Sequence, residues 1–341
     1  MERMGRMDRT RKILRRRLPQ IVATALILLL IIGIMFVAVY LYDKNHDEFQ
    51  GGGSSSVGTD KTIEYNGKTY VYKDNIETVL IIGLDAFGKA EANDSYNNDK
   101  QADLLVLLVL NRQDKSCTAI HINRDTMTEV PVLGITGQQI GVVNQQISLS
   151  HTYGDGGIDS CHNVAVTVSR MLHDLPIDSY ISMTMDGIKV ANDIIGGVTL
   201  TVLDDFSGVD DTLIQGETVT LMGDHALNYV RSRNNLEDST NEHRMIRQAQ
   251  YMEAFYAQGK ECAENNDSFV LDAVTRMNDY VVSNCSISQM DDLFEKAMSY
   301  EFDEIRTLEG ESVKGEQYME FHCDPDALKE LIVELCYTEK K

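Results

Sequence analysis

The stretch Thr78–Asp85, TVLIIGLD, is a continuous apolar run that ends in a carboxylate. A second run of the same kind, Leu104–Leu110, follows Asp103, and Thr118–Asn123 is a third and shorter one. Unbroken apolar runs of this length are typical of strands that are covered on both faces of a sheet. We therefore predict a central sheet that contains these three buried strands.

Segments with helical spacing alternate with further strands along the rest of the chain. In Ser160–Leu172 the apolar residues recur on one side of a helix. The later elements are expected, in order, to be strand Tyr180–Met185, helix Asp186–Ile195, strand Val198–Val202, helix Thr240–Ala257, strand Tyr318–Phe321 and helix Pro325–Leu335. Such alternation predicts an α/β fold, a layered α/β/α domain with a central mixed sheet flanked by helices.

The beginning of the chain predicts a membrane anchor. Residues 1–20 form a basic tail, with seven arginines and Lys12. Residues 21–42 carry no charge and, at about 33 Å of helix, are long enough to cross a bilayer. The basic tail indicates a single-pass protein of the cell membrane with its N-terminus inside and its domain extracytoplasmic. A cleaved signal peptide is disfavoured, because Val39–Asp43 lacks the small residues of a cleavage site.

The remainder reads as one domain on a spacer. We expect a flexible Gly/Ser linker at residues 43–60 and a single domain at 61–338, with its core at about 75–260. The six cysteines all follow the apolar span, and they are Cys117, Cys161, Cys262, Cys285, Cys323 and Cys336. An even number in an exported chain permits disulfides, but free thiols agree with the spacing equally well, and no CxxC pair indicates a metal site.

The charge of the chain excludes one class of partner and draws attention to its arginines. There are 31 Lys and Arg against 53 Asp and Glu, which gives a formal net charge of −22, and the basic tail makes the rest more acidic still. Phosphate backbones are held by dense basic surfaces, so we expect no nucleic acid as partner. Only nine arginines lie beyond residue 20, and four of them are Arg231, Arg233, Arg244 and Arg247.

This arginine cluster predicts an anion site, because the guanidinium fork pairs with phosphate oxygens and stays charged. Arg231 and Arg233 would share a side if their segment is extended. Arg244 and Arg247 are three residues apart and share a face of the following helix. The alternative is a solvated helix whose arginines pair with Glu237, Asp238 and Glu242.

Carboxylates at strand ends supply a second part of the site. Asp85 directly follows the first strand and Asp103 opens the second, and the loop between them is long and polar, as active-site loops often are. Two carboxylates together with substrate phosphate oxygens suit Mg²⁺. Taken singly, each aspartate is more often a turn or cap residue. Arg124 and Asp125 follow the third strand at the same presumed edge, where ligands of open α/β sheets bind.

Six short segments resemble, in order, the LytR-CpsA-Psr family. They are Thr78–Asp85 (TVLIIGLD), Ala102–Leu105 (ADLL), Ile122–Thr126 (INRDT), His151–Gly154 (HTYG), Gly196–Val198 (GGV) and Ala226–Arg233 (ALNYVRSR), and Arg244–Gln248 (RMIRQ) continues the match. The likeness is strong over about residues 75–260. The resemblance implies an extracytoplasmic transferase of a Gram-positive-type cell envelope. Its lipid-linked substrate would be a polyprenyl-pyrophosphate-linked anionic glycopolymer, such as a teichoic acid or capsular polysaccharide, and its acceptor a sugar hydroxyl of peptidoglycan.

The same resemblance implies roles for individual residues. Asp85 and Asp103 would hold Mg²⁺ against the pyrophosphate. Arg124 would bind its oxygens and, with Asp125, form the catalytic pair, in which Asp125 is either the base toward the acceptor hydroxyl or the residue that orients Arg124. The other pyrophosphate-binding residues would be Arg231, Arg233, Arg244, Arg247 and Gln248. The apolar interior would either sheath the lipid tail or be ordinary core.

Four positions depart from the family pattern, and three other functions remain open. Ala86 stands where a basic residue is common, Gln101 replaces an arginine, Asn123 a proline and Ser148 an asparagine. A non-catalytic scaffold that binds lipid-linked polymer or peptidoglycan, and a lipid pyrophosphatase, would use the same residues. A transcription regulator is disfavoured by the apolar span and the acidic exterior.

Overall fold

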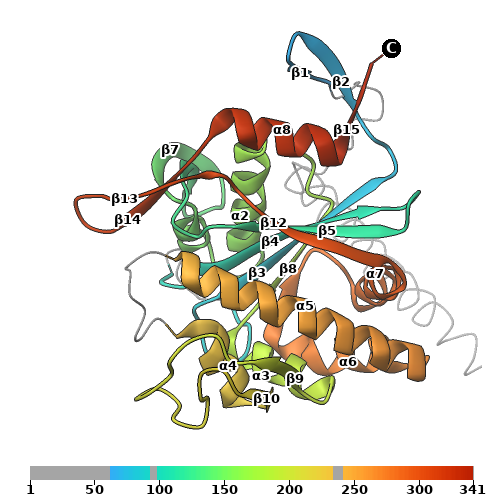
Figure 1. Cartoon of the computed structure of the whole chain (residues 1–341). Coiled ribbons are helices and arrows are strands. Elements are labelled where there is room, and N and C mark those ends of the chain that lie inside the picture. Colours follow the sequence, from blue (N-terminus) through green and yellow to red (C-terminus); the bar gives the residue numbers. More distant parts are fainter. Residues whose placement is uncertain (1–61, 93–97, 233–240, 341) are drawn as a thin grey trace, which may run out of the picture. The chain divides into compact units, whose positions relative to one another are not determined.

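The computed structural model describes residues 62–92, 98–232 and 241–340, with a six-stranded sheet at the centre (Figure 1). Its strands lie in the order β11-β8-β3-β4-β5-β12. They are β3 Ile76–Leu84, β4 Ala102–Asn111, β5 Ser116–Ile122, β8 Ser179–Met183, β11 Val281–Ser283 and β12 Glu301–Thr307. Strand β4 is antiparallel to β3 and β5, β11 is antiparallel to β8, and the pairs β3–β8 and β5–β12 are parallel. The predicted mixed sheet and its three buried strands are therefore confirmed.

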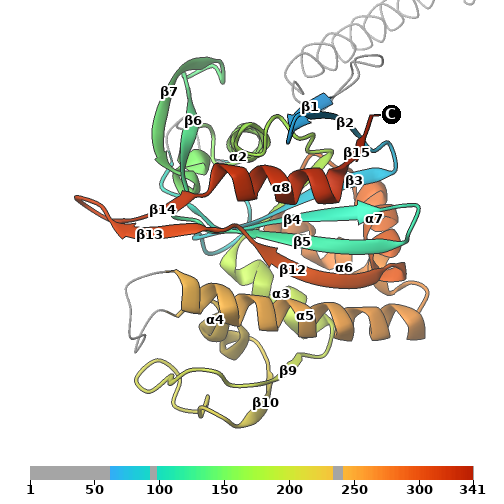
Figure 2. The same ribbon diagram turned by 45° about the horizontal axis from the view of Figure 1, so that its top comes forward.

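Helices cover both faces of this sheet, as Figures 1 and 2 show. One face carries α2 Ile158–Met171 and α8 Pro325–Cys336. The other carries α3 Met185–Ile194, α5 Glu242–Asn265, α6 Phe269–Met277 and α7 Ile287–Ser299. Short elements complete the set: α4 Asp224–Arg231 and the 3₁₀ helices η1 Ile147–Thr152 and η2 Asn278–Tyr280. The predicted flanking helices are thus present, and α5 runs beyond the predicted end at Ala257.

Small antiparallel sheets surround this body. They are β1 Thr62–Tyr65 with β2 Lys68–Tyr72 and β15 Tyr337–Glu339, β6 Met127–Leu133 with β7 Gln139–Gln146, β9 Val198–Thr201 with β10 Thr218–Leu221, and β13 Gly310–Lys314 with β14 Met319–Cys323. Among these, only β9 and β14 were predicted from the sequence. The two hairpins β6–β7 and β13–β14 both stand out from the body in Figure 2.

The core follows the alternation of side chains along the strands. On β4, Leu105 and Leu107 belong to the cluster beneath α2 and α8 and are fully buried. Leu108 and Leu110 belong to a second cluster beneath α6 and α7. Burial of each such side chain stabilises the fold by about 1.5–3 kcal/mol, so both layers contribute to stability.

Several expectations change or lie outside the described residues. Arg231, for which an extended segment was considered, is the last residue of helix α4. Arg233 itself, the basic tail, the span at 21–42 and the linker at 43–60 lie outside the described ranges. Within those ranges no helix is long and apolar enough to span a bilayer. All six cysteines are free thiols.

Candidate functional site

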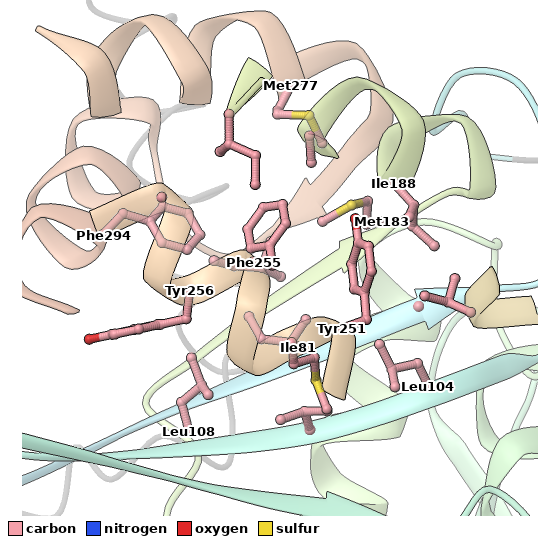
Figure 3. Close-up of a pocket in the computed structure, with 18 of the residues that line it drawn as sticks. Ile81, Leu104, Leu108, Met183, Ile188, Tyr251, Phe255, Tyr256, Met277 and Phe294 are labelled. Atoms are coloured by element: carbon pink, nitrogen blue, oxygen red, sulfur yellow. The ribbon is translucent and has the colours of Figure 1, made fainter. Parts of the chain in front are cut away.

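A cavity of about 330 Å³ lies between the central sheet and the helices α3, α5, α6 and α7 (Figure 3). Strands β3, β4 and β8 supply its floor, with Ile81, Leu104, Leu108 and Met183 among the lining residues. The helices supply its walls and roof, which include Ile188, Tyr251, Phe255, Tyr256, Met277 and Phe294. Interiors are normally packed without voids of this size, so the cavity is a feature to be explained.

Four polar residues line the same cavity: Asp103, Arg231, Arg244 and Gln248. They come from the start of β4, the end of α4 and the first two turns of α5. The surface of the cavity is almost entirely apolar, and these guanidinium, carboxylate and amide side chains contribute only a small part of it. A ligand that matches it has an apolar chain and an anionic head.

Asp103 stands at an irregularity in the β3–β4 pairing. Gly83 pairs with Leu104 and Leu84 with Ala102, so Asp103 is the extra residue of a bulge. A Cβ at Gly83 would lie 2.8 Å from the Cβ of Leu104, so the close approach of the strands here requires glycine. Bulges of this kind redirect side chains next to functional sites.

The Asp103 carboxylate joins two arginines from different parts of the chain. One oxygen, Oδ1, accepts from Arg124 Nη1, and the other, Oδ2, lies 3.3 Å from Arg244 Nη1. The exposed fractions of the Arg244 and Asp103 side chains are 2% and 13%. This partly buried carboxylate therefore links two guanidinium groups, one of which, Arg124, also lies beside Asp125.

Arg124 is held by a set of neighbouring oxygens. Its Nη2 donates to Gln101 Oε1 and, at 3.2 Å, to Ser148 Oγ. Its Nε lies 3.4 Å from Oδ1 of Asp125. The same Asp125 oxygen accepts a hydrogen bond of 2.9 Å from Gln146 Nε2, so the predicted catalytic pair is fixed in position by side chains from β7 and η1.

Arg231 contacts a second carboxylate. Its Nη2 donates to Asp85 Oδ1 at 3.3 Å, and its guanidinium carbon lies 5.5 Å from the centre of the Phe87 ring. The side chains of Arg231 and Asp85 are about half exposed, at 48% and 42%. Because Asp85 N also donates to Gln101 O, the ends of β3 and β4 bring both predicted metal ligands to one edge of the sheet.

Arg247 and Gln248 occupy different surroundings. Arg247 is buried, donates to Asp204 Oδ2 at 2.9 Å and to the carbonyl of Ser232, and packs on Phe206 at 5.1 Å. Burial lowers the pKa of its guanidinium, and Asp204 opposes that shift. Gln248 lines the cavity and donates to the carbonyl of Val230 at 3.1 Å. Gln248 therefore bonds the last turn of α4, and Arg247 bonds Ser232, the residue that follows α4.

A buried histidine lies beneath this group. His121 of β5 is 1% exposed, and burial together with the neighbouring Arg244 lowers its pKa to about 4. The imidazole is therefore neutral at physiological pH. It adds no positive charge of its own to the arginine cluster.

Oxygen donors are available for a hard metal ion. Asp85 and Asp103 present carboxylate oxygens, the ligand type that Mg²⁺ prefers, although no group of three or more His, Cys, Asp or Glu side chains suited to a metal occurs among the described residues. Such a pair fits Mg²⁺ only if phosphate oxygens and water complete the coordination. The donor set thus agrees with a metal that arrives with a phosphorylated ligand.

Three of the four positions that depart from the family pattern surround Arg124 and Asp125. Gln101 and Ser148 accept from Arg124, and Asn123 Oδ1 accepts from the Asp125 amide at 3.0 Å. Asn241, the residue before α5, donates from its Nδ2 to the same Asn123 oxygen at 3.2 Å. Sequence reasoning missed Phe87, Gln146 and Asn241, since no local pattern marks a side chain that reaches the site through tertiary structure.

Comparison with known proteins agrees with this architecture. The model of the LytR_cpsA_psr family matches residues 43–334. The chain is 27% identical over 311 residues to the "Polyisoprenyl-teichoic acid--peptidoglycan teichoic acid transferase TagU" of Bacillus mycoides (strain KBAB4), covering 88% of this chain and 92% of that protein. The TagU of Halalkalibacterium halodurans (strain ATCC BAA-125 / DSM 18197 / FERM 7344 / JCM 9153 / C-125) is 31% identical over 199 residues, or 58% of each chain.

Solved structures share the fold. "TagT bound to LI-WTA" superimposes with a TM-score of 0.60 at 23% identity, covering 84% of this chain and 96% of that one. "Crystal structure of B. subtilis TagV" gives a TM-score of 0.60 at 21% identity, covering 77% and 96%. With a family model that spans most of its length and these structural relatives, the chain belongs to the LytR-CpsA-Psr family.

Proposed function

We propose that this protein transfers a polyprenyl-pyrophosphate-linked anionic glycopolymer, teichoic acid-like or capsule-like, to a sugar hydroxyl of peptidoglycan and releases polyprenyl phosphate. The observation that carries the proposal is the cavity, whose apolar body ends at Arg231, Arg244 and Asp103. Its volume of about 330 Å³ falls in the usual range for ligand sites. The similar TagU proteins are named as teichoic acid transferases, which supports this substrate class.

The two parts of the cavity correspond to two parts of the substrate. A prenyl chain would lie among the methionine, phenylalanine and aliphatic side chains, where its burial is favourable. The pyrophosphate would lie at the polar end. There Arg231 and Arg244 would contact its oxygens directly, with Arg124, Arg233 and Gln248 as further contacts. Arg247 would act by holding the end of α4, since its described partners are Asp204 and the carbonyl of Ser232.

The transfer needs one bond to form and one to break. The acceptor hydroxyl oxygen attacks the phosphorus that carries the polymer, and the bond from that phosphorus to the bridging oxygen breaks. The bridging oxygen leaves with polyprenyl phosphate, and the hydroxyl proton passes to a base. Asp125 is the candidate base, while its 3.4 Å contact with Arg124 Nε would serve equally to orient that arginine.

Charge neutralisation is the main task of the protein in such a reaction. The arginines supply fixed positive charge around the pyrophosphate. Mg²⁺ held by Asp85 and Asp103 would supply further neutralisation of the phosphate oxygens when bound. The predicted span at residues 21–42 would place this site outside the cell membrane, close to a lipid-linked substrate.

The substitution Arg231→Ala tests the proposal. Because Arg231 is half exposed and contacts Asp85 at 3.3 Å, its loss should leave the melting temperature nearly unchanged. Loss of one positioned donor to developing charge costs about 10²–10³-fold in rate. The full-length protein in vesicles is given a lipid-pyrophosphate-linked oligosaccharide, Mg²⁺ and peptidoglycan, and the release of polyprenyl phosphate is measured. Arg112→Ala is the control, because Arg112 is an exposed arginine in the turn after β4 whose guanidinium donates to the carbonyl of Asp74.

Two results would contradict the transferase proposal. Substrate binding without release of polyprenyl phosphate by the wild-type protein would leave a scaffold. Release at the same rate without peptidoglycan would identify a lipid pyrophosphatase.

A further inference from the structure

We propose that the outward face of strand β7 binds the acceptor, an extended glycan whose sugars carry hydroxyl and acetamido groups, and guides it toward Asp125. This inference rests on the proposed function, since it names the acceptor path for that reaction. The face is defined by Ile140, Val142 and Asn144, which precede Gln146 at every second position. We call these three residues the β7 face.

The β7 face is continuous with the candidate base. Gln146 ends β7, and its Nε2 donates to Asp125 Oδ1 at 2.9 Å and to the carbonyl of Met319 at 2.7 Å. Side chains at alternate positions of a strand point to the same side, so the β7 face leads away from Asp125 for about 20 Å. That length accommodates an extended chain of several sugars with one hydroxyl at the site.

The side chains of the β7 face are open to solvent. Ile140 is 65% exposed and Val142 is 47% exposed, and Asn144 is exposed as well. On the opposite side of the hairpin, by contrast, Val130 is fully buried. Two large aliphatic side chains left in water on one strand are a common sign of a contact surface.

The edge of the hairpin is open too. Within the described residues β7 pairs only with β6, so its other edge presents main-chain N–H and C=O groups. Figure 2 shows the β6–β7 hairpin standing out from the body of the molecule. An exposed strand edge of this kind binds extended ligands through backbone hydrogen bonds.

Charged residues are scarce along strand β7 and the turn that precedes it. Residues 130–154 contain no Asp, Glu, Lys or Arg, in a chain with a formal net charge of −22. On β6, the exposed Glu129 pairs with Asn144, so one carboxylate borders the inner end of the β7 face, whereas Val142 pairs with the uncharged Pro131. The amides of β7 divide between its two sides: Asn144 and Gln146 share the side of the β7 face, whereas Gln139 and Gln145 lie on the other side, where they contact Arg170 and Tyr153.

Amides and aliphatic groups together match a glycan. Amide groups donate to and accept from hydroxyl and acetamido groups, and aliphatic side chains pack on the C–H faces of sugar rings. A lipid bilayer fits less well, because insertion of the hairpin would bury amides such as Asn144 without partners. A second copy of this chain is the remaining alternative, and the experiment includes it.

The test introduces charge into the β7 face without touching the catalytic machinery. The double variant Ile140→Asp/Val142→Asp should raise the KM for peptidoglycan fragments by about tenfold or more, with kcat and binding of the lipid-pyrophosphate donor within about twofold. The control Ile214→Asp/Leu271→Asp adds the same charge at side chains that are 52% and 45% exposed elsewhere, and should match the wild type. An uncharged variant, Ile140→Thr/Val142→Thr, separates loss of binding from loss of folding.

A direct binding measurement separates the two proposals. The chain has no tryptophan, so Ile140→Trp provides a single fluorescent reporter in the full-length protein. An N-acetylglucosamine hexasaccharide should change its emission. Titration calorimetry, which needs no tryptophan, should show binding of this glycan by the wild type and none by the double aspartate variant. If the wild type binds the hexasaccharide but releases no polyprenyl phosphate, the β7 face is supported and the transferase proposal fails.

Three outcomes would overturn the β7 face while leaving the transferase proposal intact. The first is transfer by the double aspartate variant with an unchanged KM for peptidoglycan fragments. The second is quenching of the tryptophan reporter by brominated lipids in the absence of glycan, which would show a membrane contact. The third is an emission change that depends on protein concentration alone, which would show contact with a second copy.

Discussion

The two faces of the central sheet are formed by the same strands, but one face is closely packed and the other borders a cavity. Beneath α2 and α8, residues such as Leu80, Leu107 and Ile120 are completely buried in one continuous cluster. Beneath α3, α5, α6 and α7, neighbouring positions of the same strands line a cavity of about 330 Å³. Side chains that alternate along one strand therefore separate a closed layer from a hollow one.

The cavity lowers the free energy of unfolding relative to a fully packed face. A void beside apolar groups forfeits dispersion contacts and lowers stability in proportion to its volume. The closed face supplies the packing that compensates for this loss. The hollow face, which ends at Asp103, Arg231 and Arg244, is free to accept a ligand. We expect substitutions on the two faces to separate stability from binding.

The largest expected difference concerns two adjacent leucines of β4. Leu107 is 0% exposed on the closed face, whereas Leu108 lines the cavity. Leu107→Ala should lower the free energy of unfolding by about 4 kcal/mol, because it creates a new void in a packed layer. Leu108→Ala should cost about 2 kcal/mol less, because it only enlarges an existing space. Urea denaturation of both variants measures the difference, and equal losses would show that the hollow face is packed in solution.

The polar end of the hollow face provides the next prediction. Asp103→Asn leaves Arg124 and Arg244 without their shared carboxylate, which should cost about 3 kcal/mol of stability. Inorganic pyrophosphate in excess should recover part of that loss, because it replaces the missing negative charge. Thermal melting with and without pyrophosphate measures both effects. Asp326→Asn is the control, since Asp326 lies in the first turn of α8 on the closed face, and pyrophosphate should leave its melting temperature unchanged.

The sequence predicted the strands of the central sheet but not the cavity on one of its faces. Strands β3, β4 and β5 were predicted because burial on both faces makes their sequences continuously apolar. That same property hides the cavity, since Leu107 and Leu108 are identical residues with opposite surroundings. A run of leucines gives no indication of which face is filled.

Charged residues of the site were predicted from their type and clustering, but not their partners. Arg231, Arg244 and Asp103 line one cavity, in agreement with an anion site. Arg231 was placed in an extended segment only conditionally, and the helical spacing of Ala226, Leu227 and Val230 accounts for helix α4 instead. Gln146 was missed, because its contact with Asp125 depends on how the β6–β7 hairpin folds back.

Each face also holds a neutral histidine, and these make stability depend on pH. Burial lowers the pKa of His121, beside Arg244, and of His151, beside Cys161, to about 4 in each case. Because the unfolded chain has the higher pKa of about 6.5, it binds more protons than the folded chain between pH 6.5 and 4. Stability from each histidine is therefore complete above about pH 6.5 and falls as the pH drops, by about 2 kcal/mol at pH 5.

One variant assigns part of this loss to His121. Unfolding free energies are measured at pH 7 and pH 5 for the wild type, His121→Met and His322→Gln. The difference between the two pH values should shrink in His121→Met and stay the same in His322→Gln, whose imidazole is half exposed. An unchanged difference in His121→Met would mean that water reaches the floor of the hollow face and lets His121 titrate normally.

The smallest expected effect is the most specific to the hollow face. Ala273 of α6 lines the cavity, whereas Ala165 of α2 is buried in the closed layer. Ala273→Phe should fill empty space, so the free energy of unfolding should change by less than about 1 kcal/mol, while the affinity for a short prenyl pyrophosphate falls by about tenfold. Ala165→Phe should do the reverse, because overpacking costs about 1–3 kcal/mol and leaves the ligand site of the folded molecule unchanged. Titration calorimetry with the prenyl pyrophosphate and with inorganic pyrophosphate distinguishes weaker binding of the prenyl chain from weaker binding of the pyrophosphate group. If Ala273→Phe weakens both ligands equally, the aromatic ring has disturbed the arginines and the cavity is not the site of the lipid chain.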